Sequence, residues 1–369
     1  MTAGSSPSAS DPLGMTLADY ASARRTHPQA CAGTYAKMMR CGVGVALPLP
    51  TRHEHREGVT KFCLAVGQTQ PPLESESVII PMNSYRGTNW YTLCVSSQVG
   101  CRMGCTFCET ARMGLLHNLS AADIVRQRLA AHQLMPADPS APRARFRYFG
   151  DGIQNVVFMG MGEPLDNFDH VVQSIRVFNE PQGMNIPLGH ITVSTVGRID
   201  GLRKLAALVH SRERDWWNLR LAISLNAADD ALRDVLVPIN RGMPLADLQR
   251  ALLDYPLSRK GRYLIEYVLI KGVNDSLRDA DRVAAWCRPL PCIVNVIPYN
   301  PQRDAAYDTP DNETVLAFMR RLRAGGVFVK RRVTYGRDLM GACGQLGNPD
   351  VLRRDGTERQ TRFLSGRSS

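Results

Sequence analysis

The sequence predicts an α/β fold in which a parallel sheet, covered by helices, is closed or partly closed into a barrel. Two observations predict it. After residue 89, short runs rich in β-branched and apolar residues recur, and stretches of helical character separate them. This is the pattern of repeated strand–helix units around a parallel sheet. The expected strands are residues 91–97, 155–160, 190–195, 219–225, 263–270, 292–298 and 327–335.

The N-terminal part of the chain is less regular. Residues 1–14 are rich in Ser, Pro and small polar residues, and this composition predicts disorder. A weak helical pattern covers residues 17–40, and two strand-like runs, 59–66 and 75–82, flank a polar turn that contains proline. We therefore expect residues 15–88 to form a small accessory region.

Residues 89–348 are expected to form the core domain, in which helices follow strands. Ser120 is suited to cap the first of these helices, since Asp123 lies in its first turn. In barrels of this kind the chemistry gathers at the C-terminal ends of the strands. The expected helices include residues 120–133, 243–255 and 311–325.

Composition narrows the class of function. The 369 residues carry a net charge of +11, which favours a polyanionic partner such as nucleic acid. No run reaches the roughly 18 apolar residues that a membrane helix needs, and the N-terminus lacks the apolar centre of a signal peptide. We therefore expect a cytoplasmic protein. In a reducing compartment, its ten cysteines indicate metal binding or chemistry more than structural disulfides.

Three of the cysteines are closely spaced. Cys101, Cys105 and Cys108 form a C-x3-C-x2-C pattern just after the first core strand. Three thiolates can each hold one iron of a cubane cluster and leave the fourth iron free to bind a substrate. Zinc is the alternative, with His117 as a distant fourth ligand, and three unrelated buried thiols are a third reading. The five cysteines that we assign to packing are Cys31, Cys41, Cys63, Cys287 and Cys292.

This cysteine spacing resembles that of the radical S-adenosylmethionine superfamily, and further motifs narrow the resemblance. Taken in order along roughly residues 58–348, they are similar to the RlmN/Cfr family of RNA adenine methyltransferases. The resemblance implies a partial (β/α)6-type barrel. The motifs are VSSQVGC (95–101), FMGMGEPLDN (158–167), ITVSTVG (191–197), ISLNA (223–227), GVNDS (272–276), IPYNP (297–301) and ACGQL (342–346).

The resemblance also implies a mechanism. Adenine carbons C2 and C8 are poor nucleophiles, so the family uses radical chemistry with one [4Fe-4S] cluster and two S-adenosylmethionine molecules per turnover. Cys343 corresponds to the thiol that first accepts a methyl group. Cys94 corresponds to the cysteine that then resolves the protein–RNA adduct and forms a transient disulfide with Cys343. The implied partners are ribosomal or transfer RNA and a reductant such as flavodoxin or ferredoxin, with the enzyme a monomer.

The proton acceptor is less certain from the motifs. Glu76, in ESVIIP, matches the family's base, with Glu74 as the competitor. The segment from Pro81 to Cys94 is longer than in C2 enzymes and contains Trp90, which is closer to the C8 branch. VSSQVGC and GMGEP favour C2, which we take as the expected position, with C8 as the alternative.

Other residues match the family's cofactor contacts. Glu163 would accept from the ammonium group of the methionine moiety, and the neighbouring glycines would let the backbone approach the ligand. At position 226 the family usually has His, whereas this chain has Asn226, so any acid–base role there is in doubt. The cofactor-contacting residues that the resemblance implies are Gly162, Glu163, Ser194, Ser224, Leu225, Asn226 and Asn300.

Basic residues gather toward the C-terminus. Residues 320–369 contain twelve Lys or Arg and four Asp or Glu, on both sides of Cys343. RNA phosphates would pass there to deliver a base, and residues 349–369 are expected to be a basic tail. Two other functions stay open. They are a radical enzyme that inserts sulfur, against which the pair of Cys94 and Cys343 argues, and a non-catalytic zinc-dependent RNA-binding protein.

Overall fold

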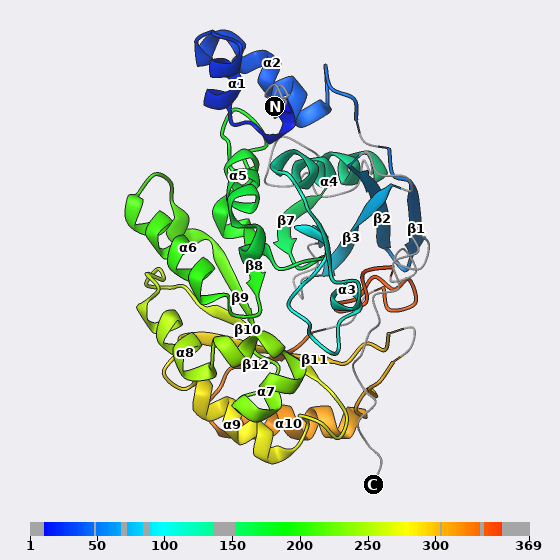
Figure 1. Cartoon of the computed structure of the whole chain (residues 1–369), viewed down its shortest axis with the longest axis vertical. Coiled ribbons are helices and arrows are strands. Elements are labelled where there is room, and N and C mark those ends of the chain that lie inside the picture. The colour runs from blue at the N-terminus through cyan, green and yellow to red at the C-terminus, as the bar shows by residue number, and fades with distance from the viewer. Residues whose placement is uncertain are drawn as a thin grey trace, which may run out of the picture.

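A ten-stranded sheet is the framework of the computed structural model, in the order β1-β2-β3-β4-β7-β8-β9-β10-β11-β12 (Figure 1). From β4 to β12 all neighbouring strands are parallel, so the predicted parallel α/β sheet is confirmed. These strands are β4 (Asn89–Cys94), β7 (Ile153–Phe158), β8 (Ile191–Thr195), β9 (Arg220–Ser224), β10 (Tyr263–Leu269), β11 (Cys292–Pro298) and β12 (Val329–Arg331). The structure describes residues 11–47, 49–67, 72–83, 89–135, 152–302, 305–332 and 336–348.

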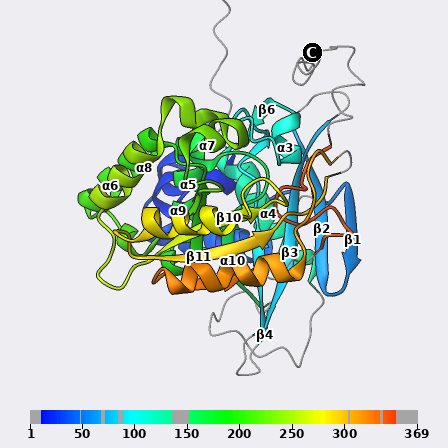
Figure 2. The ribbon, with the colours of Figure 1, turned by 90° about the horizontal axis from the view of Figure 1, so that it is seen from below.

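Helices follow the strands from β4 to β11 and lie on the outer side of the curved sheet (Figures 1 and 2). Within the described ranges, β1 and β12 stand at the two ends of the strand order, so the barrel is partial, as predicted. The helices are α4 (Ala121–Leu134), α5 (Phe168–Phe178), α6 (Ile199–Ser211), α7 (Asp230–Leu236), α8 (Leu245–Asp254), α9 (Leu277–Cys287) and α10 (Asn312–Ala324).

Local sequence signals set the helix starts. The Ser120 hydroxyl accepts from the Asp123 backbone N–H at 3.1 Å, and the Asp123 carboxylate accepts from the Ser120 N–H at 3.1 Å. This reciprocal capping satisfies two backbone donors that the helix leaves unpaired, so the predicted N-cap of α4 is confirmed. Ser276 and Asp279 repeat the arrangement at the start of α9.

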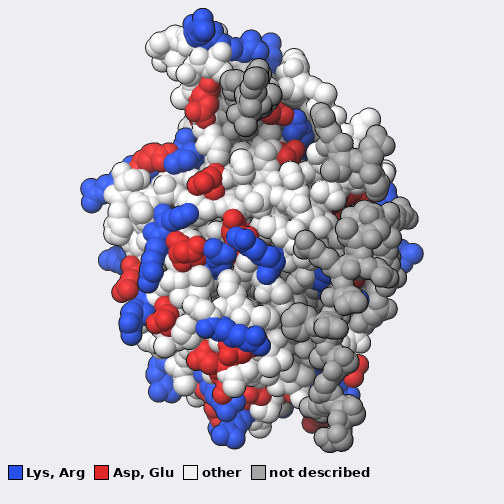
Figure 3. Space-filling view, viewed as in Figure 1, with Lys and Arg blue, Asp and Glu red and all other residues white. Residues whose placement is uncertain are grey.

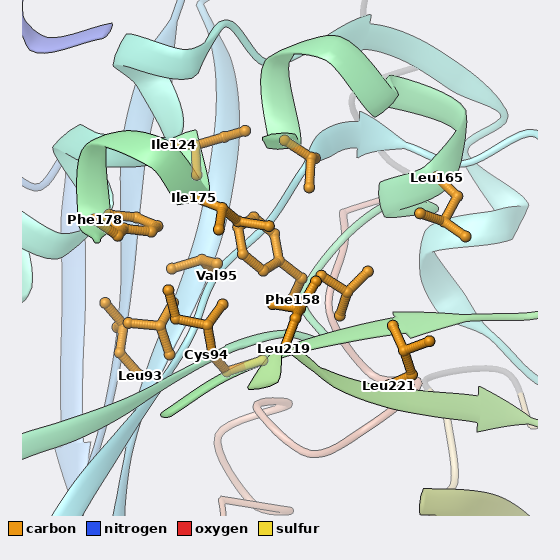
Figure 4. Close-up of a cluster of buried hydrophobic side chains, with 14 of the residues drawn as sticks. Leu93, Cys94, Val95, Ile124, Phe158, Leu165, Ile175, Phe178, Leu219 and Leu221 are labelled. Carbon is orange, nitrogen blue, oxygen red and sulfur yellow. The ribbon is translucent and has the colours of Figure 1, made fainter. Parts of the chain in front are cut away.

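Packing against the helices fixes the end of β4. Leu93 of β4 and Phe158 of β7 pack with Ile124 of α4 and Ile175 of α5, and all four are fully or almost fully buried (Figure 4). Successive side chains of a strand point to opposite faces. Cys94 therefore turns away from Leu93, and it lines a cavity inside the barrel.

The N-terminal region differs from the expectation in two ways. The expected disorder of residues 1–14 does not extend to residues 11–14, because Asp11 caps a 3-10 turn (Pro12–Gly14), pairs with Arg126 of α4, and leaves Leu13 buried. The single expected helix over residues 17–40 is two helices, α1 (Leu17–Ala23) and α2 (Pro28–Cys41). The break falls before Pro28, which favours the first position of a new helix.

The accessory region is not separate from the barrel. Its three antiparallel strands, β1 (Arg52–Arg56), β2 (Val59–Val66) and β3 (Leu73–Asn83), continue the barrel sheet through β3 and β4. The expected boundary at residues 88 and 89 therefore cuts through one sheet. A small second sheet pairs β5 (Gln98–Gly100) with β6 (Leu115–Asn118), next to the short helix α3 (Glu109–Arg112).

Some predictions concern residues that the structure does not describe. The tail of residues 349–369 and residues 1–10 lie outside the described residues, as does the end of the expected strand 327–335. No helix in the described ranges is long and apolar enough to cross a membrane.

Candidate active site

The three closely spaced cysteines lie in a loop that β5 and β6 hold closed. The Cys101 N–H donates to the Gly114 carbonyl at 2.8 Å. Gly100, at φ +74°, precedes the loop, and a Cβ there would lie 1.9 Å from the Gly114 oxygen. Only glycine permits this close approach of the two backbones, so the β5–β6 pairing fixes the start of the cysteine loop.

Burial shapes the chemistry of these thiols. It raises the pKa of Cys101, Cys105 and Cys108, and for Cys105 the neighbouring Cys108 and Cys101 raise it further. The thiolate forms therefore need positive charge, which a bound metal centre supplies. The apolar side chains packed around the loop are Met103, Phe107, Leu236, Val237, Ile270 and Tyr299.

The donor set fits an iron–sulfur cluster better than zinc. A structural zinc ion needs four ligands that converge on one point. His117, the fourth ligand that zinc would need, is exposed on β6. A cubane cluster places each ligand on a different iron, so three thiols spread around one loop can hold it.

A first cavity lies beside the cysteine loop, where the parallel strands end. Cys105 and Cys108 form one wall and the Cys343 segment forms another. Polar groups from the ends of β7, β8 and β9 converge on it, as expected for a barrel enzyme. Among the lining residues are Gly160, Gly162, Glu163, Ser194, Thr195, Ser224, Asn226 and Val268.

Glu163 is a buried carboxylate that lines this cavity, with 2% exposure. One oxygen accepts from the Leu165 N–H at 3.1 Å and the other from the Val196 N–H at 2.9 Å. Burial nevertheless raises the pKa of Glu163 to about 7. A cationic ligand group would remove this penalty, because it favours the ionised form.

We expect the unliganded protein to lose stability as the pH rises from about 4.5 to about 7. In that window the folded protein holds a proton on Glu163 that the unfolded chain releases, so the free energy of unfolding falls. The change from this carboxyl is up to about 3 kcal/mol. Urea unfolding at pH 5 and pH 8 should show a smaller pH effect in Glu163→Gln than in the wild type. Equal pH effects would contradict the assignment.

Packing also requires glycine at positions 160 and 162, just before Glu163. A Cβ at Gly160 would lie 2.7 Å from the Val95 oxygen, and one at Gly162, where φ is +98°, would lie 2.6 Å from Gln98 Cβ. Both glycines line the first cavity. The space that their missing side chains leave is filled by the segment after β4, so they also hold the β7 loop against it.

The residues after β9 are only partly as expected. Ser224 and Asn226 line the first cavity, whereas Leu225 is fully buried in the core. Asn226 adopts φ +58°, and its side-chain oxygen accepts from the Val268 N–H at 3.0 Å. An amide therefore fixes the turn from β9 to its neighbour β10, a contact that needs no titration.

The segment that carries Cys343 is held by contacts from several elements. Asn300 donates to the Cys343 carbonyl at 3.2 Å, and Arg337 donates to the Asn300 side-chain oxygen at 3.3 Å. The Glu109 N–H donates to the Gly344 carbonyl at 2.8 Å. Asn300, which the resemblance places at the cofactor, lines a second cavity and also holds the Cys343 segment.

The second cavity brings the two predicted reactive cysteines together. Cys94 and Cys343 both line it, and Cys343 also lines the first cavity. The pKa of Cys94 is raised to about 12, chiefly by burial and also by the nearby Cys343, while Arg332 acts in the opposite direction. Neither sulfur is in a disulfide.

Three residues that meet at the second cavity were not predicted from the sequence: Arg332, Glu266 and Asn295. Arg332 lies 3.4 Å from Glu266, and its pKa is raised chiefly by Cys343, then by Glu266 and Cys94. Asn295 donates to the other Glu266 oxygen at 2.9 Å. The available signal was Glu266 itself, a charged residue inside the otherwise apolar run YLIEYVLI, because a buried charge needs partners.

The two glutamates of β3 are in different surroundings. Glu76 is buried, pairs with Lys61 at 2.9 Å and accepts from the Gly347 N–H at 3.0 Å. Glu74 pairs with Arg52 at 2.6 Å on the outer part of the sheet. Glu76 thus contacts the segment that carries Cys343, but the residues lining the two cavities do not include it.

Charge is only partly concentrated where we expected it. On the face in Figure 3, the described Lys and Arg side chains are interspersed with Asp and Glu. Lys330, Arg331 and Arg332 line the second cavity and Arg337 lies near Cys343. Arg320, Arg321 and Arg323 of the expected patch lie on α10, and its basic residues from 353 onward lie outside the described residues.

Comparison with known proteins agrees with this site. Residues 95–283 match the family model of the radical SAM superfamily. A solved structure, a radical SAM methyltransferase from Sphaerobacter thermophilus, superposes with a TM-score of 0.77 at 32% identity, over 90% of this chain and 98% of that one. The partial barrel and its three-cysteine loop are therefore those of a radical S-adenosylmethionine enzyme.

Curated relatives show to which family of radical S-adenosylmethionine enzymes the chain belongs. The probable dual-specificity RNA methyltransferase RlmN 1 of Protochlamydia amoebophila (strain UWE25) is 38% identical over 83% of this chain and 78% of its own length. The dual-specificity RNA methyltransferase RlmN of Anaeromyxobacter sp. (strain Fw109-5) is 41% identical over 78% and 72%. The chain belongs to the RlmN family of radical SAM RNA methyltransferases. The family implies a [4Fe-4S] cluster, S-adenosylmethionine and an RNA substrate.

Proposed function

We propose that the protein methylates carbon C2 of an adenine in ribosomal or transfer RNA through an S-methylcysteine at Cys343. One observation carries this proposal. Cys343 lines both cavities, the one beside the cysteine loop and the one that contains Cys94. A thiol in this position can take a methyl group from a cofactor on one side and deliver it to a base on the other.

The first cavity provides the cofactor site. Cys101, Cys105 and Cys108 would hold the cluster through their thiolates. The cluster, when bound with S-adenosylmethionine, supplies the one-electron chemistry that activates an S-methyl group. Glu163 accepts from the methionine ammonium group, since its buried carboxylate favours a cationic partner.

The backbone around Ser194, Ser224 and Asn226 completes the first cavity, with Gly162 at its floor. Asn300 contributes indirectly, because it holds the carbonyl of Cys343. Two S-adenosylmethionine molecules would be consumed per turnover, one as the methyl donor to Cys343 and one to activate the S-methyl group.

Cys343 and Cys94 act one after the other in the proposed reaction. The Cys343 sulfur takes the methyl group of one S-adenosylmethionine, whose remainder leaves as S-adenosylhomocysteine. After a hydrogen atom is removed from this S-methyl group, its carbon adds to the adenine. Cys94 then attacks the Cys343 sulfur, the carbon–sulfur bond breaks, and the methylated RNA leaves as the two sulfurs form a disulfide. An external reductant, such as flavodoxin or ferredoxin, restores the thiols. Arg332 lies beside both sulfurs and stabilises thiolate charge on them.

Glu76 is the proposed acceptor of the proton that leaves C2. It contacts Gly347, four residues after Cys343, whereas Glu74 pairs with Arg52 away from this segment. Reaching the base requires Glu76 to exchange its contacts with Lys61 and Gly347. The protein acts as a cytoplasmic monomer in this proposal.

The test is anaerobic reconstitution with iron and sulfide, followed by visible absorption and mass mapping of methylated adenosine in RNA. The same mapping is done on RNA from cells with and without the gene. We expect a brown protein and 2-methyladenosine that depends on the gene. Finding 8-methyladenosine would replace C2 by C8. A colourless protein that binds one zinc and leaves RNA unmodified would contradict the proposal.

A further inference from the structure

The second cavity is large enough for a nucleoside. Its volume is about 520 Å³, within the roughly 300–1,000 Å³ that small-molecule sites occupy. Side chains of β3 and of every parallel strand line it, including apolar ones such as Ile80, Met82 and Ile297 and the amide of Asn295. Apolar walls suit the faces of a base, and an amide with a free polar atom suits its edge.

Three cationic side chains line the second cavity where the backbone phosphate of a bound nucleotide is expected. Arg220, Lys330 and Arg331 are exposed and also line the second cavity. Arg220 is the first residue of β9, so this cation lies at the end of the strand opposite the cysteine loop. A nucleotide whose base reaches Cys343 would thus meet positive charge on its backbone.

The amide of Asn295 is oriented by its neighbours. Its nitrogen donates to Glu266 at 2.9 Å, and a carboxylate can only accept hydrogen bonds. Arg332 contacts the other Glu266 oxygen at 3.4 Å and holds that carboxylate in place. The side-chain nitrogen of Asn295 must therefore face Glu266, so its oxygen is left as an acceptor.

The oxygen of Asn295 is available to a ligand. Within the described ranges it has no hydrogen-bond partner, and it is not among the buried atoms that lack one. Asn155, on the same cavity, differs. Its oxygen contacts His190 Nδ1 at 2.9 Å and its nitrogen donates to Thr92 at 3.3 Å, so both ends of its amide are engaged.

We infer that Asn295 is a specificity-determining residue that reads the exocyclic amino group of the target adenine. Adenine presents N6–H donors where guanine and hypoxanthine present an oxygen acceptor. The fixed Asn295 oxygen accepts from N6–H, and it faces an unpaired acceptor when the other bases enter. This inference rests on the proposed function, because it assigns the second cavity to the RNA base.

The test uses the reconstituted full-length enzyme and one RNA in two forms. The target position carries adenine in one form and unsubstituted purine, which lacks the amino group, in the other. The measured quantity is the ratio of kcat/KM for adenine to that for purine. Any difference in intrinsic reactivity between the bases is common to all variants, so a change in the ratio reports the contact with N6.

We expect Asn295→Ala to lower this ratio by roughly tenfold or more, mainly through a slower reaction of the adenine RNA. Asn155→Ala is the matched control, and its ratio should stay within about twofold of the wild type because the Asn155 amide is already engaged. Glu266→Gln should also lower the ratio, since a neutral amide no longer dictates which way Asn295 faces.

Binding of the two RNAs to the protein without its cofactors gives a second readout, in which Asn295→Ala should reduce the preference for adenine. This measurement and Glu266→Gln keep the test decisive if Asn295→Ala folds poorly. A wild-type enzyme that methylates adenine while Asn295→Ala and Glu266→Gln keep the wild-type ratio would overturn the inference. Absence of any adenine methylation by the wild type would instead overturn the proposed function.

Discussion

Cys343→Ala is expected to abolish RNA methylation, with a loss of at least about a thousandfold, as when a covalent nucleophile is removed. The alanine side chain has no atom that can accept the methyl group and pass it to the base. The measurement is transfer of labelled methyl from S-adenosylmethionine to RNA by the reconstituted variant. The cluster absorption should be retained, since Cys343 is not among its proposed ligands.

Cys292→Ala is the matched control for this variant. Cys292 is half-buried like Cys343, but it lies on β11 and contacts Cys287. Its substitution should leave methylation within a few-fold of the wild type. If Cys343→Ala methylated RNA at the wild-type rate, the S-methylcysteine route would be wrong even though the family assignment would stand.

Cys94→Ala is expected to trap the protein covalently joined to RNA. In the proposed sequence only the attack of Cys94 on the Cys343 sulfur releases the product. Without that thiol, the carbon bridge between Cys343 and adenine persists. The adduct should appear as a band of lower mobility on a denaturing gel and, after nuclease digestion, as one added nucleotide mass on the peptide that contains Cys343.

The double variant Cys94→Ala/Cys343→Ala provides the control and should form no adduct. Multiple turnover by Cys94→Ala, with free methylated RNA and no adduct, would refute the resolving role. Burial raises the pKa of Cys94 to about 12, which disfavours its thiolate, the nucleophilic form.

Local patterns predicted much of the fold. The residues of β2, β8 and β11 agree with the expected runs to within about one residue, and Ser120 caps α4 as expected. Caps, apolar runs and proline positions act within a few residues, so their effect can be recognised without the tertiary structure. The break before Pro28 was missed because the helical pattern on its two sides is weak.

The cysteine loop could also be recognised from residues that are close together in the sequence. Cys101, Cys105 and Cys108 lie within eight residues, and the β5–β6 pairing closes the loop around them. Their association therefore needs no long-range contact, and the sequence alone indicated it. The motif resemblance likewise indicated the radical SAM class, which the comparisons confirm.

Local sequence patterns thus account for most of the core strands, the predicted helices of the barrel and the three-thiol loop. Contacts between distant segments could not be read in the same way: Cys94 and Cys343 line one cavity, Asn300 holds the Cys343 segment, and Glu266 meets Asn295 and Arg332. These contacts depend on the register between strands. Residues on different strands become neighbours only after parallel pairing and sheet curvature set which inward side chains stand level, and no pattern within one strand contains that information.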